Sequence, residues 1–289
     1  AVNILISSMY IEQIADRIRE MGFKKEYAAL EMLLEKDTDT FQFFKYKNNQ
    51  NYMKDLDCLA ASSQDELTKQ YFELIKKTVL AGKALPEITE IYCREKQYLL
   101  NCFRGKLNEL NFVDAGAYTG DTVREMVYEG IHPERIFCFE ADQNNYKKLK
   151  EYVDHAKCKN ITCENYALWD VHTKLGIKFE NYNARVDVEE METTVESTTI
   201  DDYFQNVKIG FVKMDIEGAE RKALAGGMRT IKRDRPIMAI SIYHSLEDIT
   251  EIPKLLMREL ESYSFMVRHH SYTYSESVLY GIPKESGIL

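Results

Sequence analysis

The sequence predicts an α/β fold: a doubly wound parallel sheet preceded by a mostly helical region. Three observations support this prediction. From residue 111 onward, short apolar runs alternate with amphipathic segments that have helical spacing. The runs are apolar at almost every position, which is typical of parallel strands buried on both faces. Glycine and proline are scarce before residue 110, where helical spacing dominates and only Gly22, Gly82, Gly105 and Pro86 occur.

Residues 1–109 are predicted to form the mostly helical region. Helical spacing is present in residues 10–23, 27–36, 65–82 and 90–103. The run "NILISS" precedes the first of these helices and predicts a short strand with no earlier strand to pair with. Because an isolated strand leaves its backbone groups unpaired, we predict that residues 1–24 are the remnant of an upstream α/β domain and stay outside the main sheet.

Residues 110–289 are predicted to form the sheet domain. Strands are expected at 111–116, 135–140, 161–168, 209–215 and 236–244, with helices at 121–130, 144–156, 219–234 and 252–263. Right-handed crossovers would place these helices on both faces of the sheet. The runs 265–273 and 276–283 have no helix between them, so we expect an antiparallel hairpin at one edge.

Charge, hydropathy and cysteine content exclude several classes of function. Lysine and arginine number 38 against 47 acidic residues, and the basic residues are scattered, so we expect no nucleic-acid partner. No apolar run approaches the roughly 20 residues that cross a bilayer, and the start lacks the layout of a signal peptide. We therefore expect a cytoplasmic protein without a membrane partner. The six cysteines form no CxxC pair and predict neither a zinc site nor a disulfide framework.

The stretch "VDAGAYTGDT" follows the first predicted strand of the sheet, where an open α/β sheet binds its ligand. A dinucleotide fingerprint would have the spacing GxGxxG, whereas Gly116 and Gly120 have the spacing GxxxG between Asp114 and Asp121. Carboxylates repel a pyrophosphate but favour a ligand that carries an ammonium and a sulfonium. The charge pattern therefore indicates S-adenosylmethionine rather than a nicotinamide dinucleotide.

Two further strand ends carry acids. Glu140 follows Asp114 by 26 residues. In related folds an acid about 20 residues after the glycine loop binds the ribose hydroxyls, so this spacing is close to the expected one. The stretch "FVKMDIEGAE" ends a strand with Asp215, Glu217 and Glu220, and we favour Asp215 as a site residue. The alternative that Asp215 and Glu217 only cap the next helix stays open.

The end of the third predicted strand offers a slot for adenine. A flat base needs an apolar surface and one or two polar groups at its edge, and Asn165, Tyr166 and Ala167 can supply both. The single tryptophan, Trp169, is expected to pack in the core.

Together, "FVDAGAYTGDT", "IFCFEADQNN", "TTIDDYF" and "VKMDIEGAE" resemble the FkbM family of S-adenosylmethionine-dependent methyltransferases, from residue 110 to 283. The resemblance implies the Rossmann-like sheet of class I methyltransferases with a C-terminal antiparallel hairpin, and O-methylation of a hydroxyl on a sugar or other small metabolite. It also implies that Asp114, Gly116 and Gly120 line the methionine end of the cofactor, that Glu140 holds the ribose, and that Asn145 supports the following turn.

The predicted cofactor-binding residues are Asp114, Gly116, Ala117, Tyr118, Gly120, Thr122, Glu140, Ala141, Asn165, Tyr166, Ala167 and Asp215. The predicted catalytic residues are His244, Asp215 and Tyr118, and no metal ligand is predicted. The family commonly has Asn in place of Tyr118 and Pro in place of Ala141. Tyr118 therefore brings a ring and a hydroxyl near the reactive end, where it could shape the pocket of the small-molecule or glycan acceptor.

Methyl transfer to an alcohol also needs a general base with a pKa near neutrality, which favours histidine. His244 ends the fifth predicted strand and is the first choice. His269 and His270 are alternatives, but they point to opposite faces if the strand is extended. Asp215 is another candidate base, or a ligand for a divalent cation with Glu217, although two carboxylates on one turn do not predict a metal site.

Two functions of other classes stay open at this point. One is a nicotinamide-dependent oxidoreductase or epimerase on a similar sheet, which the missing GxGxxG counts against. The other is a non-catalytic module that keeps the cofactor fold while the helical region binds a protein. The acceptor, N-methylation and the oligomeric state are not predicted.

Overall fold

The computed structural model describes residues 42–156, 160–180, 183–187 and 193–288, together with 4–6, 17, 20–22 and 26–28. Most of the predicted helices at 10–23 and 27–36 lies outside the described residues.

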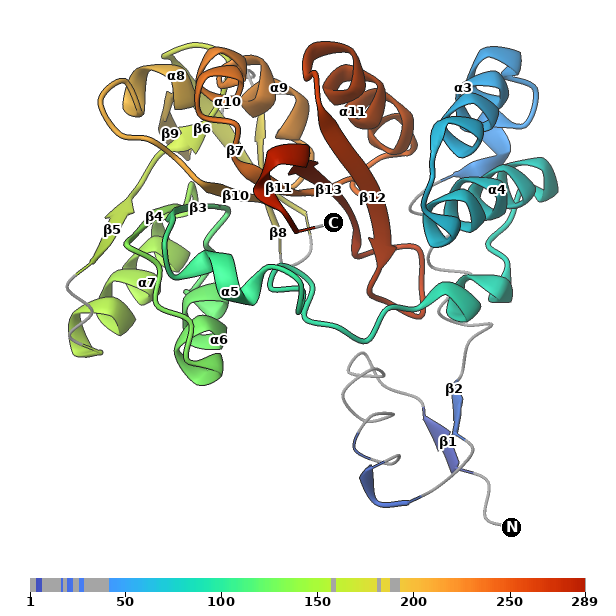
Figure 1. The fold of residues 1–289 in the computed structure, drawn as a ribbon, viewed down its shortest axis with the longest axis horizontal. Coiled ribbons are helices and arrows are strands. Elements are labelled where there is room, and N and C mark those ends of the chain that lie inside the picture. Colours follow the sequence, from blue (N-terminus) through green and yellow to red (C-terminus); the bar gives the residue numbers. More distant parts are fainter. Residues whose placement is uncertain are drawn as a thin grey trace.

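Seven of the described strands form the central sheet (Figure 1). They are β3 (Asn111–Ala115), β4 (Arg135–Phe139), β5 (Ile161–Glu164), β10 (Phe211–Met214), β11 (Ile237–Ser241), β12 (Tyr263–His269) and β13 (Ser277–Pro283). Their order across the sheet is β12-β13-β11-β10-β3-β4-β5. All neighbours pair in parallel except β13, which is antiparallel to both β11 and β12. The predicted doubly wound sheet with an antiparallel hairpin at one edge is confirmed.

Helices cover both faces of this sheet, as Figure 1 shows. From residue 104 onward the described helices are α5 (Arg104–Leu107), α6 (Asp121–Glu129), α7 (Gln143–His155), α8 (Ile200–Tyr203), α9 (Glu220–Ala225), α10 (Met228–Asp234) and α11 (Leu246–Glu259). Alternate residues of one strand belong to different core clusters, because successive side chains of a strand point to opposite faces. Thus Phe112 packs with Val123 of α6, whereas Val113 packs in the cluster that contains Ile231 of α10.

A second sheet of four short strands was not predicted. It contains β6 (Ala167–Leu168), β7 (Lys174–Glu180), β8 (Asn183–Asp187) and β9 (Thr194–Thr198), in the order β6-β9-β7-β8. The predicted strand at 161–168 therefore divides into β5 and β6. Trp169 is buried in the small core cluster beside this sheet, as expected.

The region before the sheet contains η1 (Phe43–Tyr46), α3 (Gln50–Ser62), α4 (Glu66–Ala81) and η2 (Pro86–Ile91). The helix predicted at 65–82 is confirmed, and α3 was not predicted. The helix predicted at 90–103 is wrong, because the segment after η2 is irregular up to α5. Its apolar residues, including Leu99, Leu100 and Phe103, are buried against the sheet, so their spacing came from tertiary packing.

The strand predicted near the start is β1 (Ile4–Ile6). It pairs in parallel with β2 (Glu26–Ala28) in a separate two-stranded sheet and does not join the central sheet. Residues 27 and 28 therefore belong to a strand rather than to the helix predicted at 27–36.

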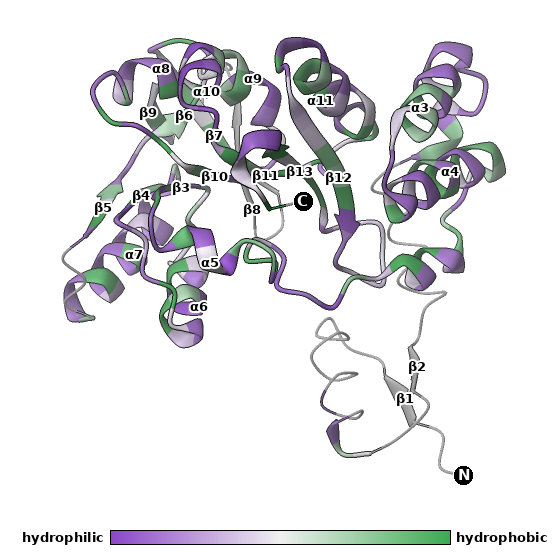
Figure 2. Cartoon of the chain, viewed as in Figure 1, coloured by the Kyte–Doolittle hydropathy of each residue, from purple (hydrophilic) through white to green (hydrophobic). Residues whose placement is uncertain are grey.

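Helix α4 lies beside the edge strand β12, and α3 lies beside α11 (Figure 1). Thr68 Oγ1 accepts a hydrogen bond of 2.8 Å from the backbone N–H of Val267, so the helix satisfies part of an otherwise open sheet edge. Figure 2 shows hydrophilic and hydrophobic sides on α3 and α4, as expected for helices that pack on one side only. None of the described helices has the length and apolarity that a membrane span requires.

Asp65 fixes α4 to the sheet, and its removal is expected to destabilise the protein. Its Oδ2 atom caps the helix by accepting from Thr68 N at 2.9 Å, and its two oxygens lie 2.6 and 2.9 Å from the guanidinium of Arg268 on β12. We expect Asp65→Ala to lower the free energy of unfolding by about 1–3 kcal/mol in urea titrations. Asp55→Ala, which breaks the more exposed pair with Lys254, should cost at most about 1 kcal/mol.

The effect of Asp65 depends on pH. Burial works to raise the pKa of Asp65, but Arg268 and Thr68 outweigh it and lower the pKa to about 2. Because the folded pKa is depressed, this contribution is present above the ordinary value of 3.8 and is lost as the pH falls toward 2. The stability difference between wild type and Asp65→Asn should therefore shrink through this range. A difference that stays constant from pH 7 to pH 2 would contradict the assignment.

Candidate functional site

A cavity of about 290 Å³ opens at the carboxyl ends of β3, β4 and β10. Strand order reverses beside β3, which is the point where open α/β sheets bind ligands. We call this cavity the strand-end pocket. Its wall consists of Gly116, Tyr118, Asp121, Phe139, Glu140, Ala141, Asn145, Tyr166, Ala167, Leu168, Lys213, Asp215, Ile216, Glu217, Ala219, Tyr243 and Glu276.

The loop after β3 is tied to the end of β4 by its backbone. The N–H groups of Gly116 and Ala117 both donate to the carbonyl of Phe139 at 3.0 Å, and the N–H of Tyr118 donates to Glu140 Oε2 at 2.8 Å. Gly116 has a φ of 79°, which favours glycine. The side chain of Tyr118 is half exposed, so it lies at the rim of the pocket.

Glu140 is held rigidly at the end of β4. Its Oε1 atom accepts from Asp142 N at 2.8 Å, and its Oε2 atom accepts from Tyr118 N. Burial raises the pKa of Glu140 to about 7, against the effect of these two hydrogen bonds. Each carboxylate oxygen has a second lone pair, so the fixed carboxylate can still accept two hydrogen bonds from a ligand.

Asp114 does not line the pocket as the resemblance implied. Its side chain is completely buried, and its Oδ1 atom lies 3.0 Å from Lys213 Nζ on the neighbouring strand β10. Lys213 Nζ also donates to the carbonyl of Gly116 at 2.5 Å. The pair therefore supports the floor of the pocket from below.

Four other predicted cofactor residues support the wall without lining it. Ala117 in the loop and Thr122 in the first turn of α6 are both buried, and Gly120 packs against Leu149 and Tyr152 of α7. Asn165 donates to the carbonyls of Glu140 and Ala141 at 2.8 and 3.1 Å, which fixes the turn behind the pocket.

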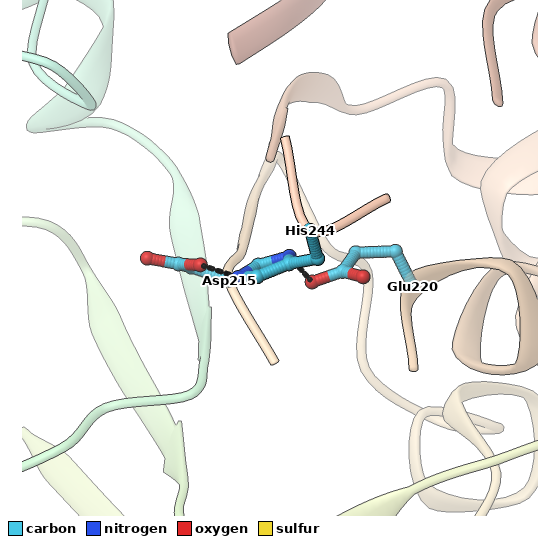
Figure 3. Close-up of side chains that lie close together, drawn as sticks. All are labelled: Asp215, Glu220 and His244. Atoms are coloured by element: carbon cyan, nitrogen blue, oxygen red, sulfur yellow. Dashed lines mark ion pairs between the residues drawn. The ribbon is translucent and has the colours of Figure 1, made fainter. Parts of the chain in front are cut away.

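Four side chains gather beside the pocket and form what we call the His244 cluster: Asp215, Glu217, Glu220 and His244. His244 Nε2 lies 3.3 Å from Asp215 Oδ1 and 3.5 Å from Glu217 Oε2, and His244 Nδ1 lies 3.1 Å from Glu220 Oε1. Figure 3 shows the imidazole between the carboxylates of Asp215 and Glu220. Asp215 and Glu217 line the pocket, whereas His244 and Glu220 lie behind them.

The electrostatics of this cluster do not favour the predicted role of His244 as general base. Burial works to lower the pKa of His244, but the carboxylates of Glu220 and Asp215 outweigh it and raise the pKa well above its ordinary value. Burial works to raise the pKa of Asp215, but His244 and Lys213 overcome it and lower the pKa. An imidazole that already holds its proton at neutral pH cannot accept one from an alcohol, and an acid with a low pKa is a weak base.

The other two candidate histidines lie away from the pocket wall. His269 Nδ1 lies 2.9 Å from Ser277 Oγ, and burial lowers the pKa of His269 to about 3. His270 contacts the carbonyl of Cys93 and the hydroxyl of Tyr280, and burial lowers its pKa to about 4. The lowered pKa values mean that both imidazoles are neutral at pH 7; His269 is buried and His270 is half-buried.

Several site residues were missed from the sequence. Tyr98 donates to Asp215 Oδ2 at 2.8 Å, and Gln97 donates to Glu276 Oε2 at 2.6 Å. Both lie before α5 in the irregular segment for which the sequence predicts a helix at 90–103. Glu276 precedes the antiparallel strand β13, so it lies at the same edge as the carboxyl ends of the parallel strands, a position that the predicted hairpin could have indicated.

Three wall residues other than glycine have a left-handed backbone. The φ angles of Tyr118, Glu217 and Glu276 are 47°, 57° and 63°. Such conformations cost energy in L-residues and cluster at functional sites. Burial, followed by the charge of Asp215, raises the pKa of Glu276 to about 7.

One family model matches more than half of the chain. Residues 114–274 match the methyltransferase FkbM domain. The structure is similar to that of a methyltransferase FkbM from Methylobacillus flagellatus, with a TM-score of 0.68 and 19% identity over 96% of this chain and 73% of that chain. Two weaker similarities each have a TM-score of 0.42. One is to an rRNA methylase from Streptococcus thermophilus, with 12% identity over 63% of this chain and 90% of that chain. The other is to a fibrillarin from Aeropyrum pernix, with 15% identity over 64% of this chain and 71% of that chain. No curated protein sequence matches the chain.

Proposed function

The chain belongs to the FkbM methyltransferase domain family, and from this premise we propose that it transfers a methyl group from S-adenosylmethionine to a hydroxyl of a sugar or other small metabolite. The position of Glu140 is the main observation that supports S-adenosylmethionine as the cofactor. A buried carboxylate, fixed by two backbone N–H groups at the end of β4, faces a pocket beside a loop that approaches it with its backbone.

The residues of the strand-end pocket fit this cofactor chemically. Glu140 can accept hydrogen bonds from the two ribose hydroxyls. Phe139, Ala141 and Leu168 supply an apolar surface suited to adenine, with Tyr166 at its edge. The wall does not suit the pyrophosphate of a dinucleotide, because its described residues include no cation other than the buried Lys213 that could neutralise phosphates. This also favours S-adenosylmethionine over a nicotinamide dinucleotide.

The charge of the pocket also suits a cationic donor. Asp121, Asp215 and Glu217 all lie on the wall, and we assign them to the methionine end of the cofactor. Lys213, the wall cation, lies 3.0 Å from Asp114, so its charge is already balanced. The wall therefore has an excess of negative charge that favours an ammonium and a sulfonium.

The chain's own residues would act mainly by alignment and by excluding water. When bound, S-adenosylmethionine supplies a methyl group that its positive sulfur activates for displacement. Tyr98 and Tyr243 donate hydrogen bonds to Asp215 at 2.8 and 3.3 Å and so fix its carboxylate at the reactive end. Glu276 is the wall carboxylate at this end whose pKa is raised, so it suits the uptake of the hydroxyl proton better than His244.

Calorimetry with S-adenosylhomocysteine tests the proposal. Wild type should bind this product, and Glu140→Ala should weaken binding by about 10- to 100-fold, because two hydrogen bonds to a charged group are lost. Glu134→Ala is the matched control, since Glu134 is exposed and precedes the same strand at its opposite end. Binding of NAD in place of S-adenosylhomocysteine would overturn the proposal.

A further inference from the structure

The His244 cluster contains more negative charge than its neighbours balance. Asp215, Glu217 and Glu220 surround a single imidazole. Lys213 also acts on Asp215, but it is shared with Asp114 at 3.0 Å, and Arg221 is paired with Asp248 at 2.8 Å. Glu220 is fully buried, and burying a carboxylate is costly unless a cation compensates it, so the cluster is suited to bind one.

We propose that Asp215, Glu220 and His244 bind a divalent metal ion at the wall of the strand-end pocket, and that the ion displaces the imidazole proton of His244 to solvent. Each residue offers one donor atom, and these atoms all lie within 4.8 Å of one another. Ligand atoms about 2.0–2.2 Å from a shared ion lie roughly 3 to 4.4 Å apart. His244 turns Nε2 toward Asp215 and Nδ1 toward Glu220, so the imidazole or the Glu220 side chain would rotate for all three residues to reach one ion. The ligands come from the end of β10, the first turn of α9 and the end of β11, three elements that the sheet holds together.

Two of the three donor side chains, His244 and Glu220, are buried and have atoms without hydrogen bonds. The side chain of His244 is 7% exposed and that of Glu220 is 0% exposed. Within the described part of the chain, no hydrogen-bond partner is found for either ring nitrogen of His244 or for Glu220 Oε2. Buried polar atoms of this kind are rare in folded proteins unless an ion or a water satisfies them.

The other oxygens of the two carboxylates are already oriented. Tyr98 donates to Asp215 Oδ2 at 2.8 Å, and the N–H of Ile216 donates to Glu220 Oε1 at 2.8 Å. Outer hydrogen bonds of this kind hold the ligands of metal sites in place. They leave Glu220 Oε2 without a hydrogen bond, whereas Asp215 Oδ1 accepts one longer bond of 3.3 Å from the hydroxyl of Tyr243, which an ion would compete with.

The donor set indicates the class of cation. One imidazole and two carboxylates suit a first-row divalent ion such as Mn²⁺ or Zn²⁺ better than Ca²⁺ or Mg²⁺, which prefer oxygen alone. Because Asp215 and Glu217 line the pocket, the ion would face the acceptor and could orient its hydroxyl. Only this consequence rests on the proposed methyl transfer; the binding of the ion does not.

A Mn²⁺ titration of the EDTA-treated full chain, followed by electron paramagnetic resonance, tests the site without any turnover. Wild type should bind one Mn²⁺ per chain saturably. Asp215→Asn and His244→Ala should each weaken binding by at least about 10-fold, and Glu220→Gln by a similar factor. His172→Ala is the control, since His172 pairs with a single carboxylate, Asp202, at 2.9 Å on an exposed surface, and it should bind like wild type.

Circular dichroism shows whether each variant is folded. If His244→Ala is unfolded, Asp215→Asn still tests the site, because asparagine has nearly the same shape as aspartate and is expected to leave the fold intact. Absence of saturable Mn²⁺ binding to wild type, or unchanged binding by a folded Asp215→Asn or His244→Ala, would overturn the proposal. The cluster would then be an imidazolium held by carboxylates. Binding of S-adenosylhomocysteine to the metal-free chain tests the proposed function separately, so the two failures are distinguishable.

Discussion

Replacing Gly116 with alanine is expected to lower the free energy of unfolding by about 3–5 kcal/mol and to weaken S-adenosylhomocysteine binding by more than about 100-fold. An added Cβ would lie 1.7 Å from the carbonyl oxygen of Asp215, and φ at Gly116 is 79°. Neither partner can move away easily, because Asp215 N donates to Ala115 O at 3.0 Å within the parallel pair of β3 and β10. The substitution therefore forces the loop off the end of β4.

Two other glycines separate the causes of this effect. Gly130 has a φ of 67° with no atom within 4 Å of an added Cβ, so Gly130→Ala should show the backbone strain alone, about 1–2 kcal/mol. Gly105 has neither feature and lies in α5, so Gly105→Ala should be neutral or slightly stabilising. Urea unfolding measures all three. If Gly116→Ala unfolds like Gly130→Ala, the close approach to Asp215 does not constrain the loop.

Lys213→Met is expected to cost about 3–5 kcal/mol of folding free energy, because it leaves a buried carboxylate without its partner. Lys213 and Asp114 face each other across β10 and β3, and their side chains are 3% and 0% exposed. Burial raises the pKa of Asp114 to about 6, against the effect of Lys213. The double variant Lys213→Met, Asp114→Leu should recover most of the lost stability, since an apolar pair removes the cost of burying both charges.

The double variant also tests what the pair does for the site. Lys213 donates to the carbonyl of Gly116, so S-adenosylhomocysteine binding should stay weaker than in wild type even where stability returns. Lys222→Met is the control, because it breaks an exposed pair with Asp170 and should cost less than about 1 kcal/mol. A double variant as unstable as Lys213→Met would show that the loss comes from packing rather than from the unpaired carboxylate.

The parts of the fold that were predicted correctly have local causes. The strands β3, β4, β10 and β11 are largely apolar runs of four or five residues buried on both faces, so their sequences carry the signal by themselves. The segment before α5 shows the limit of this reasoning. Its apolar residues repeat at helical spacing, but they are spaced to reach different parts of the sheet, and the segment brings Tyr98 to Asp215.

The sequence also predicts only part of the site. The positions of Gly116, Glu140 and Asp215 at three strand ends follow from the strand pattern, because the carboxyl ends of parallel strands meet at one edge. Whether a side chain at that edge faces the pocket does not follow. Asp114 and Asp215 are both acids at strand ends, yet Asp114 lies beneath the loop with Lys213 while Asp215 lies on the wall.

The sequence by itself therefore determined the class of fold, the edge of the sheet at which the pocket opens and some of the acids on its wall, namely Asp121, Glu140, Asp215 and Glu217. Only the tertiary structure decided the partners of those acids: Lys213 under Asp114, Tyr98 on Asp215, and His244 between Asp215 and Glu220. The physical reason is that strand formation depends on neighbouring residues, whereas protonation and metal binding depend on charges brought within a few ångströms by distant parts of the chain.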